Sequence, residues 1–123
     1  MTENEVAKQI VDAAYGIHTS LGPGLLESAY EECLCRELDL KGVLFERQKP
    51  LPLAYKGIAL ECGYRLDVLV EGRIIIEIKS VEILAPIHEA QILTYLKLAR
   101  MKVGLLINFN VPILKGGIKR FVV

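Results

Sequence analysis

The sequence predicts a mixed α/β fold, of the α+β kind, in which helices pack on a central sheet. Two helical patterns occupy the first third of the chain. Four short aliphatic runs follow, and a third helical pattern separates them from two final apolar runs. With 123 residues, of which 52% are hydrophobic, the chain is long enough for one core and too short for two. We therefore expect a single domain, residues 1–123.

Hydrophobic residues at intervals of three and four predict two helices before any strand. Thr2 and Glu5 have the spacing of a capping box, and the first helix should run to about Thr19. The Gly-Pro-Gly segment at 22–24 ends it, and the second helix follows and ends near Lys41. Its expected inward residues are Leu26, Ala29, Tyr30, Cys33, Leu34 and Leu38.

Short aliphatic runs separated by turn signals predict strands from Val43 onward. The runs are VLFERQ, LPLAY, IALECGYRLDVLV and RIIIEIKSV, with turns at 56–57 and 71–72. An antiparallel meander is their simplest arrangement. Pro86 suits the first turn of a third helix that extends to about Met101, after which KVGLLINF returns as a strand and IKRFVV closes the sheet edge.

The stretch YRLDVLVEGRIIIEIKSVE, residues 64–82, places charges in two aliphatic strands. A two-residue turn would mix charges and aliphatic side chains on both faces. An odd loop, for example three residues ending in Gly72 at positive φ, gathers Asp67, Glu77 and Lys79 on one face, and we predict this loop. The six aliphatic residues sent to the other face are Leu66, Val68, Val70, Ile74, Ile76 and Ile78.

The gathered charges point to chemistry as well as structure. Two carboxylates from adjacent strands, with an ammonium group close to Glu77, suit Mg²⁺ or Mn²⁺, which need only one or two carboxylates besides waters and substrate phosphate. Alternating charges on one strand face are also typical of the solvated side of a sheet. Spacing alone leaves both interpretations open.

Two helices carry further candidate residues. Glu27 lies in the first turn of the second helix, where the helix dipole favours a carboxylate, and Tyr30 and Glu31 follow on its stripe. A helix-terminal acid with no other duty is the competing interpretation of Glu27. On the third helix, Gln91 and Tyr95 form an inward polar stripe that needs partners. His88 begins this stripe, either as a general base or as a capping residue.

Composition and the absence of known motifs exclude several classes of function. Fifteen basic residues balance fifteen acidic ones, so no global basic field steers the chain to a polyanion. Cys33, Cys35 and Cys62 lack zinc-site spacing and fit free thiols in a reducing compartment. The chain shows no signal peptide or membrane-spanning run, and we expect a cytoplasmic protein without membrane contact. Motifs of nucleotide-binding loops, serine hydrolases and zinc proteases are absent.

The order of motifs along nearly the whole chain resembles the GxxExxY protein family, a branch of the PD-(D/E)XK nuclease superfamily. The motifs are Gly24-x-x-Glu27-x-x-Tyr30, Tyr64-Arg65-Leu66-Asp67, Glu77-Ile78-Lys79 and Gln91-x-x-x-Tyr95, followed by GLLINF and GIKRFVV. Leu66 stands where the superfamily motif has proline, as is usual in this branch.

The resemblance implies one nuclease-like domain with a restriction-endonuclease-like core, a central mixed sheet with antiparallel hairpins flanked by helices. It implies Asp67 and Glu77 as ligands of Mg²⁺ or Mn²⁺, joined by the Ile78 carbonyl, and Lys79 as the active-site lysine. Glu27 resembles the helical acid that completes such sites, directly or through water. The accessory residues are Tyr30, Arg65, Gln91 and Tyr95.

The function implied is a metal-dependent nuclease that hydrolyses phosphodiester bonds in DNA or RNA. The alternative is a non-catalytic module that keeps the fold for binding nucleic acid or protein. The neutral net charge would require a local basic patch, such as Lys115, Lys119 and Arg120. The sequence leaves open the choice of DNA or RNA and whether the chain forms a homo-oligomer.

Overall fold

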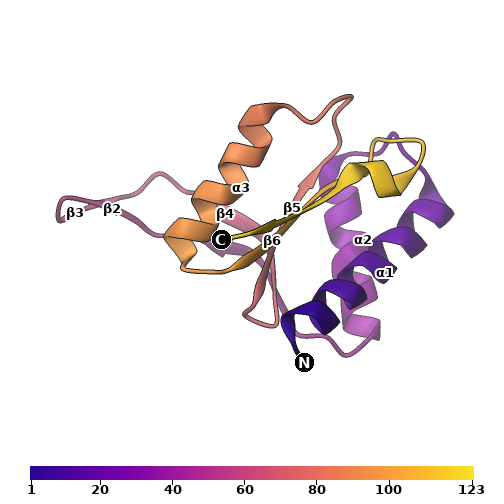
Figure 1. Ribbon diagram of the computed structural model, residues 1–123, viewed down its shortest axis with the longest axis horizontal. Coiled ribbons are helices and arrows are strands. Elements are labelled where there is room, and N and C mark those ends of the chain that lie inside the picture. Colours follow the sequence, from indigo (N-terminus) through magenta and orange to yellow (C-terminus); the bar gives the residue numbers. More distant parts are fainter.

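The protein, described over residues 1–123 by a computed structural model, is built on a five-stranded sheet with helices on both faces (Figure 1). In spatial order the strands are β1 (Phe45–Pro50), β4 (Arg65–Val70), β5 (Ile74–Lys79), β6 (Val103–Asn108) and β7 (Ile118–Val122). Strands β5 and β6 are parallel and the other neighbours are antiparallel, so the sheet is mixed, as predicted. A short 3-10 turn, η1 (Leu114–Gly117), precedes β7.

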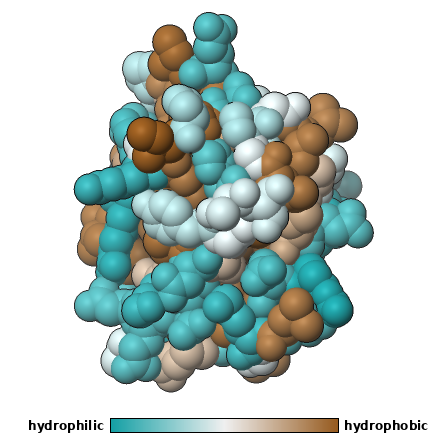
Figure 2. All heavy atoms as spheres, turned by 90° about the vertical axis from the view of Figure 1, so that its right-hand side faces the viewer, coloured by the Kyte–Doolittle hydropathy of each residue, from teal (hydrophilic) through white to brown (hydrophobic).

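Helices α1 (Glu3–Leu21) and α2 (Glu27–Leu40) cover one face, and α3 (Pro86–Ala99) covers the other (Figure 1). The capping box of Thr2 and Glu5 is present, and α1 ends two residues beyond the predicted Thr19. Hydrophilic side chains cover much of the outer surface over α1 and α2 (Figure 2). None of the three helices combines the length and the apolar character that crossing a membrane would require.

The sheet has a hydrophobic core on each side. The larger core joins α1 and α2 to the sheet through residues such as Ile10, Leu34 and Ile76, all fully buried. The smaller core joins α3 to the sheet. Gly104 in β6 allows this close approach, because a Cβ atom there would lie 2.9 Å from Cδ1 of Ile92 on α3.

The predicted antiparallel meander is wrong. Strands β2 (Leu53–Tyr55) and β3 (Ile58–Leu60) form a separate hairpin that projects from the body (Figure 1), and β1 pairs directly with β4. Two prolines around the start of this hairpin, Pro50 and Pro52, lack the N–H groups that a continuing ladder would need. A hydrogen bond of 2.9 Å from Leu51 N–H to the Tyr64 carbonyl closes the hairpin at its base.

The odd loop between β4 and β5 is confirmed. Val70 pairs with Ile74, so the loop has three residues, 71–73, and lies one residue later than a loop ending in Gly72. Glu71 and Gly72 both have positive φ, 54° and 61°, and the Arg73 N–H donates to the Val70 carbonyl at 2.9 Å.

Two expected core positions differ from the prediction. Five of the six aliphatic residues of the hairpin lie in the larger core, but Leu66 lies in the smaller one with Leu69 and Ile75. The paired residues of β4 and β5 end at Val68–Ile76, so the first residues of β4 are not held in the plane of β5. Leu26 is 76% exposed because it is the N-cap of α2 and precedes the buried stripe.

Candidate functional site

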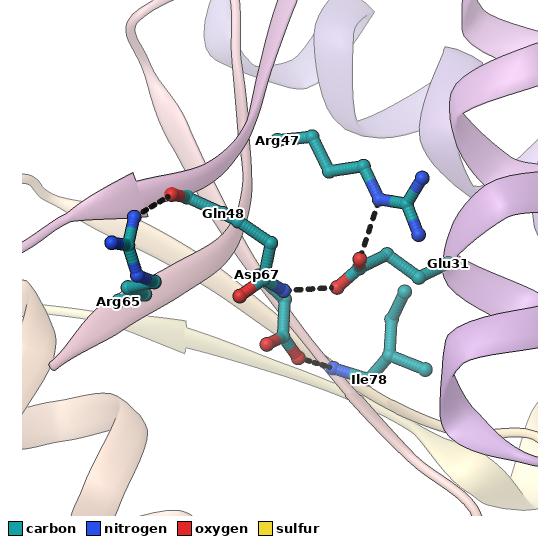
Figure 3. Close-up of polar contacts among 6 residues, drawn as sticks. All are labelled: Glu31, Arg47, Gln48, Arg65, Asp67 and Ile78. Atoms are coloured by element: carbon teal, nitrogen blue, oxygen red, sulfur yellow. Dashed lines mark hydrogen bonds and ion pairs between the residues drawn. The ribbon is translucent and has the colours of Figure 1, made fainter. Parts of the chain in front are cut away.

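The predicted carboxylates meet where β4 and β5 stop pairing. Beyond Val68–Ile76 the backbone ladder is interrupted, and the side chain of Asp67 takes over one of its hydrogen bonds. The Ile78 N–H donates to Oδ2 of Asp67 at 2.8 Å (Figure 3). The separation of the strands thus holds the Asp67 carboxylate against β5, next to Glu77.

Glu77 is buried without full compensation. It is only 3% exposed, and its Oε1 atom is buried with no hydrogen-bond partner. Buried polar atoms in folded proteins nearly always have a partner, so an orphaned carboxylate oxygen calls for an explanation. Burial, followed by the negative charge of Asp67, raises the pKa of Glu77 to about 9.

The pKa of Asp67 is shifted in the same direction as that of Glu77. Burial raises its pKa above the ordinary value, the Ile78 N–H opposes this shift, and the nearby charge of Glu31 adds to it. The two carboxylates repel each other and Glu77 is buried, so at neutral pH its raised pKa keeps a proton on Glu77. A divalent cation would replace that proton and give the orphaned oxygen of Glu77 a partner, so the pair fits such an ion.

The protein contains no group of three or more His, Cys, Asp or Glu side chains arranged to hold a metal ion. The carboxylates that meet at this point are therefore those of Asp67 and Glu77. Mg²⁺ is commonly bound through one or two carboxylates and otherwise keeps its waters, so two are sufficient for that ion.

Lys79 is joined to the polar stripe of α3. Its Nζ donates to Oε1 of Gln91 at 3.1 Å, and Nε2 of Gln91 donates to the Tyr95 hydroxyl at 3.2 Å. Tyr95 is buried, and burial is also the main reason that its pKa is raised. The expected need of Gln91 and Tyr95 for partners is thus met by Lys79 and by each other.

Glu27, the first residue of α2, has its carboxylate beside the end of β5, where it contacts Ser80, the residue after Lys79. Its Oε2 accepts the Ser80 N–H at 3.3 Å, while the Ser80 hydroxyl donates to the Leu25 carbonyl at 2.5 Å. Glu27 is exposed, in contrast to Glu77. The start of α2 is therefore attached to the strand that carries Glu77 and Lys79, with the Glu27 carboxylate open to solvent.

Tyr30 supports the loop before α2. Its hydroxyl donates to the Gly22 carbonyl at 2.6 Å and accepts the Leu25 N–H at 3.2 Å. Its ring stacks on Phe109, with centroids 4.4 Å apart and planes 5° from parallel. The contacts of Tyr30 thus hold the Gly-Pro-Gly loop, and with it the start of the helix that carries Glu27.

Two other candidates have local partners. Nη1 of Arg65 donates to the Gln48 carbonyl at 3.0 Å (Figure 3), and the side chain is exposed. Nδ1 of His88 accepts the Ala85 N–H at 3.0 Å, which is the capping role considered for it. Neither residue has a hydrogen bond to Asp67 or Glu77.

Sequence reasoning missed a network beside Asp67. Glu31 of α2 is buried and accepts hydrogen bonds from Nε of Arg47 at 2.6 Å and from Nε2 of Gln48 at 2.7 Å (Figure 3). Gln48 lies between the pairs Arg47–Val68 and Lys49–Leu66, at the position facing Asp67, and has φ of 52°. The one signal in the sequence was that Glu31 lies one helical turn after Glu27. The role of Gln48 gave no signal, because a glutamine does not indicate a positive φ angle.

A mixed sheet between helices, with Asp67 on one strand and Glu77 and Lys79 on the next where the two separate, defines a restriction-endonuclease-like fold. The model of the PD-(D/E)XK nuclease superfamily matches residues 4–121, and the chain belongs to this superfamily. Membership supports a nuclease-type function in general. Comparison with curated proteins and with solved structures found no match.

Proposed function

We propose that the protein is a metal-dependent nuclease that hydrolyses phosphodiester bonds in DNA or RNA. The observation that carries this proposal is the buried, hydrogen-bond-deficient Glu77 next to Asp67 at the point where two strands separate. A purely solvated strand face would not bury a carboxylate in this way. The superfamily, whose members typically use divalent metal ions, gives independent support.

In this proposal Asp67, Glu77 and the Ile78 carbonyl hold Mg²⁺ or Mn²⁺, with Glu27 contributing directly or through water. The bound ion would polarise the scissile phosphate and lower the pKa of a water molecule. Lys79 is oriented by Gln91 at 3.1 Å and stabilises negative charge on the phosphoryl oxygens.

Finer assignments belong to the same proposal. We assign the chain to the GxxExxY branch on the motif from Gly24 to Tyr30, in which Tyr30 positions the loop before Glu27. Arg65, exposed at the start of β4, is proposed to contact substrate phosphate. Residues 1–123 act as one domain, and the three free cysteines fit a cytoplasmic protein.

Metal titration of matched variants tests the proposal. Mg²⁺ and Mn²⁺ are titrated into the wild type, Asp67→Ala, Glu77→Ala and the control Asp39→Ala, which removes an exposed acid of α2. Loss of a residue that only supports a metal ligand typically costs about 10-fold or more in affinity. Since Asp67→Ala and Glu77→Ala each remove a proposed ligand itself, we expect at least that loss in both and unchanged affinity in the control.

Cleavage of single- and double-stranded DNA and RNA is measured on the same four proteins. We expect activity in the wild type and in Asp39→Ala, and loss of it in the other two. Equal metal affinity in all four proteins, with no cleavage of any substrate, would contradict the proposal and leave a non-catalytic binding module.

A further inference from the structure

A largely apolar hollow lies between α3 and the segment that leads into β4. We call it the α3 recess; it has a volume of about 340 Å³. Its lining includes Leu53, Tyr64, Ile87, Gln91, Tyr95 and Leu98. This volume falls at the lower end of the range of small-molecule sites, which typically combine apolar walls with a few polar groups.

The α3 recess shares a wall with the proposed active site. Gln91 lines the recess and also accepts the hydrogen bond of Lys79 at 3.1 Å. The Tyr95 hydroxyl, which accepts from Gln91 at 3.2 Å, belongs to the same wall. A group seated in the recess therefore lies one side chain away from Lys79.

Aromatic rings dominate one side of the recess. Tyr64 is 45% exposed and meets Tyr95 edge to face, with centroids 6.3 Å apart and planes 64° from parallel. Tyr64 also lines a neighbouring hollow with Lys49 and Leu51, so more than one side of this residue is accessible. An exposed ring of this kind is a stacking surface for a planar ligand.

The α3 recess is uncharged, but cationic side chains lie next to it. No charged side chain lines the recess. Lys79 is hydrogen-bonded to the lining residue Gln91, and the exposed Arg65 is the next residue in the chain after the lining residue Tyr64. An uncharged, flat group would fit the recess and an anionic group would fit its rim. A nucleotide combines both properties, with a base that stacks and a phosphate that pairs with cations.

We propose that the α3 recess binds an unpaired nucleobase of the substrate, stacked on Tyr64, so that the substrate is single-stranded or locally unpaired nucleic acid. This inference rests on the proposed nuclease function and names its substrate class. Bases inside a duplex are stacked on their neighbours and must be unstacked and turned out, at a cost in free energy, before they can enter such a recess. A single strand offers its bases without that cost.

Binding measurements on Tyr64 variants test the proposal without reliance on catalysis. Fluorescently labelled single strands of DNA and RNA, and the matching duplexes, are titrated in EDTA with wild type, Tyr64→Leu, Tyr64→Phe and Tyr15→Leu. Tyr15, an exposed tyrosine on α1, is the matched control on the opposite face of the sheet. Thermal unfolding of each variant verifies that the fold is intact.

We expect Tyr64→Leu to weaken single-strand binding by between about 5-fold and 150-fold, the loss that corresponds to one base–aromatic stack. Tyr64→Phe keeps the ring and should bind like the wild type, as should Tyr15→Leu. A single strand with one abasic site at the bound position should bind the wild type about as weakly as the intact strand binds Tyr64→Leu.

Two results would overturn the inference: equal binding of single strands by wild type and folded Tyr64→Leu, or tighter wild-type binding of duplex than of single strand. The first would leave the recess for another ligand, such as an apolar peptide. Cleavage assays separate this failure from that of the nuclease. If single strands bind through Tyr64 but are not cleaved in Mg²⁺ or Mn²⁺, base binding in the α3 recess is supported and the nuclease function is overturned. If cleavage occurs and Tyr64→Leu leaves it unchanged, the nuclease function is supported and base binding in the recess is overturned.

Discussion

At the scale of single residues, the carboxyl pair of β4 and β5 links the site to stability. Glu77 has a pKa of about 9 in the folded protein, against an ordinary value of 4.5, because it is buried next to Asp67. In the folded state it therefore keeps its proton at pH values where the unfolded chain has lost it. The raised pKa of Asp67 acts in the same sense.

We predict that the metal-free protein loses stability as the pH rises. The contribution of Glu77 to the free energy of unfolding should be largest below pH 4.5 and should decrease as the pH rises to about 9. One titrating group contributes at most about 1.4 kcal/mol per pH unit. Urea denaturation in EDTA at several pH values between 5 and 8.5 measures the slope.

The control for this prediction is Glu77→Gln, which cannot ionise and should remove most of the slope. Cys35 does not interfere, because burial raises its pKa to about 11 and its ionisation lowers stability only above pH 9. A wild-type free energy of unfolding that is flat or rises between pH 5 and 8.5 would contradict the buried, protonated state of the pair.

At the scale of elements, local patterning predicted the central hairpin and failed for the sheet around it. The alternation of Asp67, Glu77 and Lys79 with aliphatic residues specified an odd loop, because a one-residue change of register reverses every face. The pairing of β1 with β4 joins residues on either side of the β2–β3 hairpin. Periodicity within a strand carries no information about such a distant partner.

The loop of this hairpin allows a paired test of backbone conformation. Gly72 has φ of 61°, a conformation that costs other L-residues about 1 kcal/mol, and its hypothetical Cβ meets no atom within 4 Å. We predict that Gly72→Ala lowers the free energy of unfolding by about 1 kcal/mol. The cause would be backbone strain alone, and denaturant unfolding measures it.

Gly16 is the matched control for Gly72. It lies inside α1, and a Cβ atom there also meets nothing within 4 Å. Because alanine favours a helix over glycine, Gly16→Ala should raise the free energy of unfolding by about 0.5–1 kcal/mol. If both substitutions shift stability in the same direction, the positive φ at Gly72 does not govern the loop.

At the scale of the whole molecule, the crossover from β5 to β6 assembles the site. These parallel neighbours require a connection across one face of the sheet, and α3 provides it. The crossover brings Gln91 to Lys79, which explains why an otherwise apolar helix keeps an inward amide. The need of Gln91 for a partner was visible in the sequence. The Glu31 network was not, because it depends on positive φ at Gln48 and on α2 packing against β1.

The neutral net charge of the molecule also constrains how it can bind nucleic acid. Two of the three residues of the predicted basic patch are engaged, since Lys119 pairs with Glu89 at 2.9 Å and Arg120 bonds to Asn4 at 2.8 Å, and only the exposed Lys115 has no such partner. Lys79 and Arg65 are then the two cations proposed to contact phosphate. Stacking of a base in the α3 recess would have to supply much of the remaining affinity, and stacking releases no counterions.

We therefore predict a weak salt dependence of single-strand binding. Two phosphate contacts correspond to a slope of about −1.4 for log affinity against log salt concentration, or roughly a 7-fold loss between 50 and 200 mM salt. Proteins that contact six to ten phosphates lose about 1,000-fold or more over the same range. Fluorescence anisotropy of a labelled single strand at four salt concentrations measures the slope, and Arg65→Gln should reduce it by about half. A loss of 100-fold or more in the wild type would mean that Lys119 and Arg120 leave their partners to bind phosphate, so that charge, and not stacking, drives recognition.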